Sequence, residues 1–217
     1  MLREETVESA TFELLRRLQS EQILKDTRLV GGTALSLQIG HRISEDLDLF
    51  TTEPFDTDII IHILTRKYNF TPRIVTGNTI IGDIEGVKVD VICHPYSWLE
   101  SPVEENGVKI ATTKDIAAMK LHAIINSGKR PKDFVDIAYL SQSYCYDDMK
   151  GFLMDKYPSY DPIMADRAIT YFGDIDSDNI PTIKMVNEVF DFERIKARLY
   201  QMADNPFKIF KSSPLSA

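Results

Sequence analysis

The feature that most constrains the fold is a pair of glycines between a short extended run and an apolar helix. Residues 28–30 favour a strand, Gly31-Gly32 permits a tight turn, and the segment from Thr33 favours a helix that ends at Gly40. A helix start that follows a glycine turn presents unpaired backbone N–H groups and the positive end of the helix dipole. The segment therefore predicts either a phosphate-binding corner or an ordinary tight turn.

A second pattern places acidic residues at alternate positions in Asp46-Leu47-Asp48. On a strand, this spacing puts both carboxylates on one face and the leucine on the other. Neighbouring carboxylates suit Mg²⁺, which completes its coordination with waters and substrate phosphates. Asp90 alternates with valines in a later run and would supply a third carboxylate for two-metal phosphoryl transfer. The alternative for each carboxylate is a solvated strand face.

Two predicted helices in the second half carry unusual charges. Lys120 lies in a nearly apolar stretch, where a lysine either extends its ammonium group to solvent or contacts a phosphate. Asp133 and Asp136 share one face of the next helix, which Pro131 begins. A solvated charged helix face is the alternative for this pair.

The distribution of strand and helix patterns divides the chain near residue 110. We expect an α/β part over residues 1–110 and a helical part over residues 111–217 that completes the active site. The clearest hairpin joins two β-rich runs through Glu85-Gly86. The expected strands are 28–30, 46–50, 70–75, 79–84 and 87–92, and the main expected helices are 4–20, 33–40, 58–67, 113–126 and 131–142.

Composition excludes several classes of protein. With 43% hydrophobic and 27% charged residues, the 217-residue chain is typical of globular proteins. The net charge of -8 argues against coating nucleic acid through a generally basic surface. The two cysteines form neither a disulfide framework nor a zinc pattern, and no apolar run predicts a signal peptide or a membrane span. We expect a cytoplasmic protein with no membrane partner.

The glycine and acidic motifs, at residues 29–37 and 40–50, together resemble the opening of the AbiEii/AbiGii toxin family of nucleotidyltransferase-like proteins. The Lys120 helix and the run Arg130 to Ile137 are similar to later motifs of that family. The resemblance implies an α+β fold, with a nucleotidyltransferase-like mixed β-sheet, flanking helices and an α-helical C-terminal part.

The resemblance also implies roles for individual residues. The expected nucleotide-binding residues are Gly31, Gly32, Thr33, Arg42 and Arg130. The expected catalytic residues are Asp46, Asp48, Lys120, Asp133 and Asp136. Asp46, Asp48 and Asp90 are the expected ligands of Mg²⁺, the implied cofactor. Either Asp90 or Asp136 is expected to help deprotonate the acceptor hydroxyl.

The leading functional interpretation is a Mg²⁺-dependent nucleotidyltransferase that moves NMP from an NTP to an RNA acceptor, with tRNA as the expected acceptor. It would act as the toxin of a toxin–antitoxin pair, so its partners would be NTP, RNA and a cognate antitoxin protein. The basic cluster Lys129, Arg130 and Lys132, with Arg42 near the acidic motif, favours RNA. The alternatives are a nucleotide-binding regulatory protein without transfer activity, and transfer to a small molecule or a protein side chain.

Overall fold

The computed structural model describes residues 1–216 and divides into two compact units. Unit 1 comprises residues 1–40 and 44–112, and unit 2 comprises residues 41–43 and 113–216. The main division after Thr112 lies two residues beyond the change expected at residue 110. The assignment of His41 to Ile43 to the helical unit was not predicted, because nothing in the local sequence pattern distinguishes these residues from an ordinary loop.

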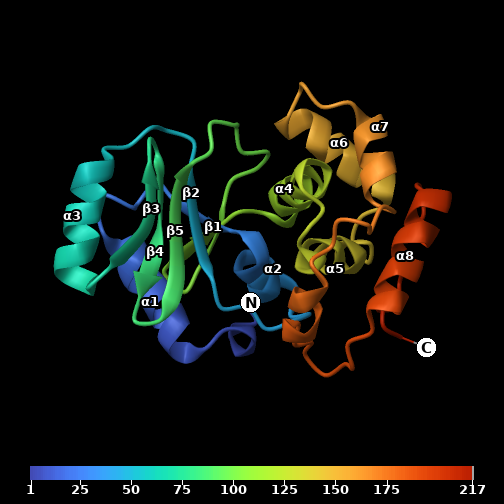
Figure 1. Cartoon of the computed structure of the whole chain (residues 1–217), viewed down its shortest axis with the longest axis horizontal. Coiled ribbons are helices and arrows are strands. Elements are labelled where there is room, and N and C mark those ends of the chain that lie inside the picture. The colour runs from blue at the N-terminus through green and yellow to red at the C-terminus, as the bar shows by residue number, and fades with distance from the viewer. Residues whose placement is uncertain (217) are drawn as a thin grey trace. The chain divides into compact units, whose positions relative to one another are not determined.

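Unit 1 contains a seven-stranded mixed sheet with the strand order β3-β4-β5-β2-β1-β7-β6 (Figure 1). Strand β2 runs parallel to β5, β1 runs parallel to β7, and the other neighbours are antiparallel. The strands are β1 Arg28–Val30, β2 Leu47–Thr51, β3 Thr71–Thr76, β4 Thr79–Ile84, β5 Val87–Cys93, β6 Val103–Glu105 and β7 Val108–Ile110. Its helices are η1 Glu4–Thr6, α1 Ser9–Ser20, α2 Gly31–Ile39 and α3 Thr57–Tyr68.

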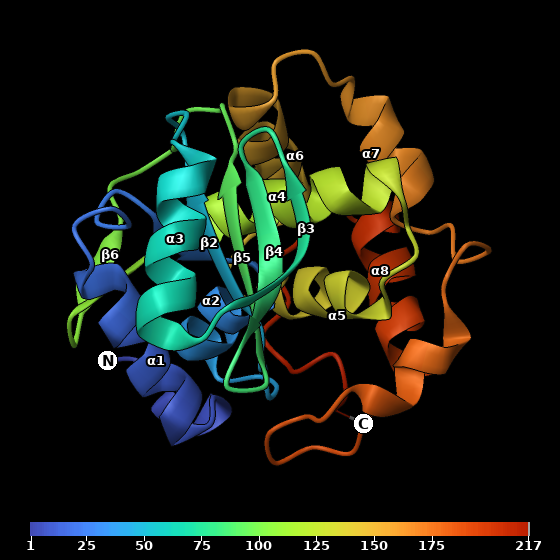
Figure 2. The same ribbon diagram turned by 60° about the vertical axis from the view of Figure 1, so that its left-hand side comes forward.

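Alternating burial gives the sheet one core face. Leu47 and Leu49 of β2 align with Val89 and Val91 of β5, and all four side chains are buried. The intervening Asp48 and Asp90 consequently share the opposite face. Figure 2 shows α1 and α3 on the same side of the sheet, and their buried leucine and isoleucine side chains supply the apolar cover.

The two hairpins of unit 1 differ in how well they could be predicted. The β4–β5 hairpin turns at Glu85-Gly86 as expected, with both residues at positive φ. The β6–β7 hairpin was missed because its strands are only three residues long and prolines nearby favour a loop. Its turn, Asn106-Gly107, also has positive φ at both positions and is the strongest short hairpin signal available.

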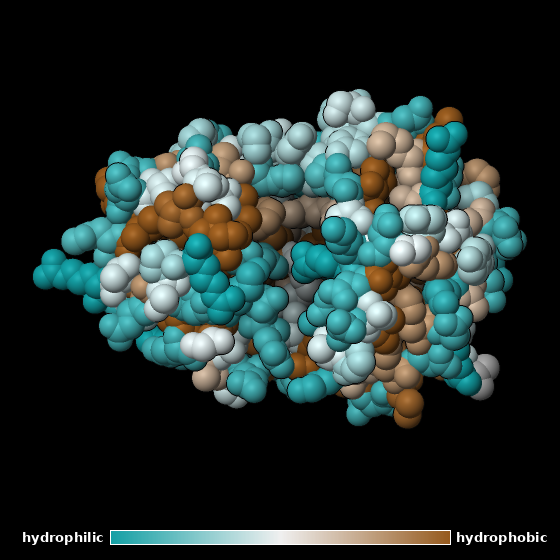
Figure 3. Space-filling model, in the orientation of Figure 1, coloured by the Kyte–Doolittle hydropathy of each residue, from teal (hydrophilic) through white to brown (hydrophobic). Residues whose placement is uncertain are grey.

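The edge strand β3 is exposed along its whole length. Figure 3 shows an apolar patch over this part of the sheet, and Ile74 and Val75 of β3 have half-exposed side chains. Pro72 cannot donate a ladder hydrogen bond, and Arg73 places a charge on the same strand. Both features oppose the addition of another strand at this edge.

Unit 2 is helical and is built around α4. This helix packs against α5, α6 and α7, while α5 also packs against α8. The helices are α4 Thr113–Asn126, α5 Pro131–Leu140, α6 Tyr146–Lys156, α7 Pro162–Ala168, η2 Ser177–Thr182 and α8 Phe192–Asp204. Within residues 1–216, no helix combines the length and apolar character needed to cross a membrane.

Candidate functional site

The glycine turn of unit 1 forms a sharp corner at the start of α2. Gly31 is the first residue of the helix and has a φ of +71°, a conformation that glycine adopts without steric cost. Among the residues described, no side chain caps this helix start. The N–H groups of the first turn therefore retain the capacity to bind an anion, which the helix dipole also favours.

The carboxylate of Asp48 lies directly against this corner. A Cβ atom added to Gly31 would clash with Oδ2 of Asp48, so any other residue here would displace the carboxylate. Val30, which precedes Gly31, is paired with Asp48 across β1 and β2. The anion-binding corner and a carboxylate are thus adjacent within unit 1.

Asp90 lies beside Asp48 on the neighbouring parallel strand. Its side chain is buried, and its Oδ1 atom has no hydrogen-bond partner among the described residues. Its Oδ2 atom accepts a hydrogen bond of 2.7 Å from Nζ of Lys88. A buried carboxylate oxygen without a partner is costly, so Oδ1 is a candidate to receive a proton or to bind a cation.

Lys88 is a site residue that the sequence analysis missed. Burial disfavours its charge, but the hydrogen bond and charge of Asp90, with smaller effects of Asp48 and Asp46, raise its pKa overall. Lys88 is therefore a cation among the three predicted carboxylates. The signal was present, because Lys88 and Asp90 alternate on one strand and must share a face.

Asp46 and Thr33 support the same corner by a different contact from the one expected. Asp46 precedes β2 instead of beginning it, and its backbone carbonyl accepts a hydrogen bond from the Thr33 hydroxyl. Thr33 is only 1% exposed, and its hydroxyl also lies 3.0 Å from that of Ser44. The threonine thus fixes the loop before β2, and the groups at this corner that can bind an anion are mainly backbone N–H groups.

The carboxylates of this corner fit a cation whose coordination is completed by substrate phosphates. No group of three or more His, Cys, Asp or Glu side chains within residues 1–216 is arranged to hold a metal ion alone. Asp48 and Asp90 nevertheless lie side by side, and one Asp90 oxygen has no partner in the described part of the chain. Because Mg²⁺ commonly uses one or two carboxylates together with substrate phosphates, this pair is compatible with it.

In unit 2, Asp136 is the centre of a buried charge cluster. It is 0% exposed and accepts hydrogen bonds from Arg42 at 2.7 and 3.0 Å and from His41 at 2.8 Å. Lys120 Nζ lies 2.8 Å from Oδ2 of Asp136. Burial would raise the pKa of Asp136, but the charges of Arg42 and Lys120 and the hydrogen bonds outweigh this effect and hold it well below its ordinary value.

This geometry bears on two predicted roles. Of the two alternative bases, Asp136 is the weaker candidate, because its oxygens already contact three side chains and its pKa is held low. Arg42 was expected to bind nucleotide, yet its guanidinium is 2% exposed and forms a bidentate pair with Asp136. Both residues belong to the buried cluster of unit 2.

Lys120 does not extend its ammonium group to solvent, so the snorkelling alternative is wrong. Its side chain is 6% exposed, and Nζ lies 2.5 Å from Asp133 Oδ1. Burial disfavours its charge, but Asp133 and Asp136 raise its pKa above the ordinary value. Arg130 is 65% exposed in its side chain and lies 3.9 Å from Asp133, so it remains accessible as a phosphate ligand.

Comparisons with known proteins identify the family to which the chain belongs. The family model described as "Nucleotidyl transferase AbiEii toxin, Type IV TA system" matches residues 13–89 and 74–184. An uncharacterised protein of Aquifex aeolicus is 32% identical over 195 residues, which cover 87% of this chain and 94% of the relative.

Two solved Helicobacter pylori structures have a similar fold. One, itself proposed to be a nucleotidyltransferase, has a TM-score of 0.56 and 18% identity, with 91% of this chain and 94% of that chain covered. The other, JHP933, has a TM-score of 0.55 and 18% identity, with 94% and 92% covered. The expected fold class and the family resemblance are confirmed, and the chain belongs to the AbiEii nucleotidyl transferase toxin family.

Proposed function

We propose that this nucleotidyltransferase moves NMP from an NTP to a hydroxyl of an RNA acceptor, with tRNA as the expected acceptor. The observation that carries the proposal is the contact of Asp48 with the Gly31 corner, with Asp90 on the adjacent strand. In this proposal, the first-turn N–H groups of α2 bind the β- and γ-phosphates, and the α-phosphate lies next to the two carboxylates.

In the transfer reaction, one bond to the α-phosphorus replaces another. The acceptor oxygen forms a bond to the α-phosphorus, the bond to the bridging oxygen breaks, and pyrophosphate leaves. The acceptor proton passes to Oδ1 of Asp90, while Lys88 holds the other oxygen of that carboxylate. With Oδ1 of Asp90 accepting the proton, Asp48, with Asp46 nearby, would hold Mg²⁺, which would neutralise charge on the phosphates.

The catalytic roles expected of Lys120 and Asp133 remain proposals for unit 2. Nζ of Lys120 pairs with Asp133 and Asp136, and their charges keep the ammonium group protonated despite its burial. The toxin role and a cognate antitoxin are supported by the family description, which names a type IV toxin–antitoxin system. We therefore expect expression of the wild type to arrest growth and Asp48→Asn to relieve the arrest.

The direct experiment incubates the purified chain with each labelled NTP, Mg²⁺ and total tRNA. We expect label on RNA with at least one NTP and none with Asp48→Asn. Label on the protein itself, or on a small acceptor, would replace the RNA assignment by one of the alternative acceptors. NTP binding without any labelled product would instead favour a regulatory nucleotide-binding protein.

A further inference from the structure

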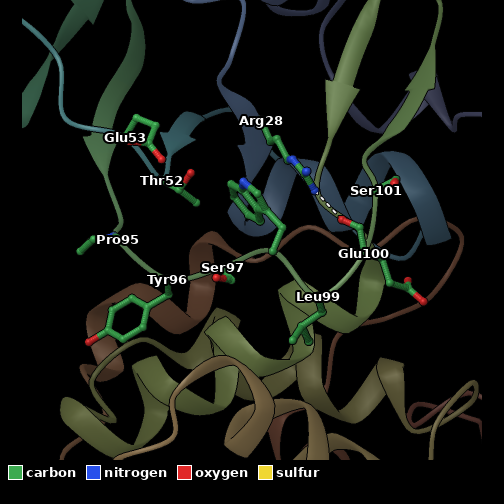
Figure 4. Close-up of a pocket in the computed structure, with 10 residues that line it drawn as sticks. Arg28, Thr52, Glu53, Pro95, Tyr96, Ser97, Leu99, Glu100 and Ser101 are labelled. Carbon is green, nitrogen blue, oxygen red and sulfur yellow. Dashed lines mark hydrogen bonds between the residues drawn. The ribbon is translucent and has the colours of Figure 1, made fainter.

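A pocket at the far end of the acidic strands, called here the Trp98 pocket, has a chemistry unlike that of a phosphate site. It has a volume of about 620 Å³, within the range of ligand sites, and lies wholly within unit 1. Figure 4 shows Thr52 and Glu53 on one side of it and Glu100 and Ser101 on the other. Its remaining lining residues are Arg28, Pro95, Tyr96, Ser97, Trp98 and Leu99.

Flat side chains give the pocket stacking surfaces. The Arg28 guanidinium lies 4.4 Å from the ring centroid of Trp98, and its Nη1 atom donates a 2.7 Å hydrogen bond to the Glu100 carbonyl. A chain of ring contacts joins Tyr96 through His94 to Phe50 on the sheet, at centroid distances of 4.8 and 5.7 Å. Aromatic and guanidinium planes of this kind stack unpaired nucleobases.

The charges of the pocket favour a base over a phosphate. Arg28 is its one cation, whereas Glu53 and Glu100 carry two carboxylates, so the lining has a net charge of -1. Phosphate would be repelled, but the amino and imino N–H groups of nucleobases can donate to carboxylates.

The strand register places Asp48 between the glycine corner and the Trp98 pocket. Val30 pairs with Asp48, and Arg28 pairs with Phe50, so the pocket end is two residues, or roughly 7 Å, from Asp48 along the sheet. Gly31 lies at the other end of β1. Because the attacking and leaving oxygens are roughly in line in phosphoryl transfer, an acceptor must approach opposite the leaving pyrophosphate.

We propose that the Trp98 pocket binds an unpaired nucleobase of the acceptor RNA, stacked on the Trp98–Arg28 pair. This inference rests on the proposed transfer to RNA and adds a subsite that positions the acceptor strand. It assigns the pocket to the acceptor and not to the base of the NTP, whose triphosphate occupies the glycine corner.

The test uses Trp98 as its own reporter, because it is the only tryptophan in the sequence. Single-stranded oligoadenylate and oligocytidylate are titrated into the full-length chain while tryptophan fluorescence is recorded. We expect saturable quenching by at least one oligonucleotide, little quenching by duplex RNA, and none by Mg²⁺ with NTP alone. Quenching by NTP but not by RNA would overturn the acceptor assignment, and no quenching by either would overturn the pocket as a base site.

Variants separate stacking from general RNA affinity. Trp98→Leu should weaken single-stranded RNA binding, measured by labelled-RNA anisotropy, by about 5- to 100-fold, whereas Trp98→Phe should retain most of it. Phe207→Leu, a change at a 78% exposed aromatic residue outside the pocket, is the matched control and should bind as the wild type does. Equal binding by all four proteins would overturn the proposal.

The same assays distinguish failure of this inference from failure of the proposed function. Saturable quenching without label transfer would leave the pocket assignment standing and overturn transfer to that RNA. Transfer to RNA without quenching, and with an unchanged KM for RNA in Trp98→Leu, would leave the function standing and overturn the pocket.

Discussion

The Oδ2 atom of Asp48 occupies the space next to Gly31 that a Cβ atom would require, so the glycine and the carboxylate depend on each other. Gly31 also has a φ of +71°, which places a second constraint on the same residue. A single position therefore determines both the backbone direction at the start of α2 and the placement of the carboxylate.

Gly31→Ala should abolish transfer and destabilise unit 1. The left-handed backbone costs about 1–2 kcal/mol for alanine, and displacement of Asp48 adds to this. Gly86→Ala is the matched control, since Gly86 has a φ of +84° but nothing within 4 Å of an added Cβ. Urea unfolding and the transfer assay should show a backbone cost in both variants but loss of activity only in Gly31→Ala. Equal activities would contradict the proposed role of the corner.

Lys120→Met should reduce both stability and transfer. Apolar surroundings suggest from sequence that methionine would be tolerated, but the structure shows that Asp133 would lose its buried partner. Removing one member of a buried ion pair costs about 3–5 kcal/mol. Lys120→Met combined with Asp133→Asn should recover part of this loss in a double-mutant cycle, but not the transfer activity.

Lys156→Met provides the control for the functional part of the Lys120 prediction. Lys156 forms a 2.8 Å pair with Asp115, and both side chains are 0% exposed. This variant should lose comparable stability and, assayed well below its melting temperature, keep its transfer activity. If both lysine variants lose activity in proportion to stability, Lys120 has only a structural role.

The cluster around Asp136 should make the protein less stable as the pH falls from neutral. Burial lowers the pKa of His41, so the unfolded chain binds a proton near pH 6.5 before the folded chain does, and the stability that neutral His41 contributes is lost as pH falls. Since Asp136 only accepts, neutral His41 donates from Nε2, and its Nδ1 atom has no partner among residues 1–216.

His41→Gln should therefore flatten the dependence of unfolding free energy on pH between about 7 and 5. The other groups around His41, namely Arg42, Lys120 and Asp136, remain charged across this range. His122, whose pKa burial also lowers, is present in both proteins and cancels in the comparison. Urea midpoints measured across the range provide the test, and parallel curves for the two proteins would contradict it.

Local patterns were sufficient for the elements that carry the unit 1 corner. The glycine turn, the alternating Asp48 strand and the Asp90 strand could each be located because their periodicity and turn residues act over a few positions. The partners of Lys120 could not be predicted from local patterns. Lys120 contacts Asp136, which also contacts Arg42, and Arg42 lies 94 positions earlier in the sequence. Helical periodicity identifies a buried face but does not show which charges meet on it.

The same limit explains why the sequence left Asp90 and Asp136 as alternative bases. Asp90 and Asp136 are both aspartates, and only their contacts in the folded chain show which one is available as a base. Asp136 is saturated by Arg42, Lys120 and His41, while one Asp90 oxygen has no partner among the described residues. Lys88 was overlooked for a related reason, since a lysine on a strand is ordinary until its pairing with Asp90 is known.

Mg²⁺ together with the correct NTP should raise the melting temperature of the wild type more than either alone. A ligand at 100 times its Kd stabilises the native state by about 2.7 kcal/mol, provided that it does not bind the unfolded chain.

Asp48→Asn should lose this increase and all transfer, because the carboxylate beside the phosphate corner is removed. Asp46→Asn should have the same effect on transfer. Without ligand, both variants should melt at or slightly above the wild-type temperature, because one of several neighbouring negative charges is gone. Asp83→Asn, on the outer part of the same sheet and paired with Arg73, is the control and should respond to Mg²⁺ and NTP as the wild type does. If Asp48→Asn unfolds without ligand, or keeps the full thermal shift, the carboxylate is structural and its assignment to the cation is wrong.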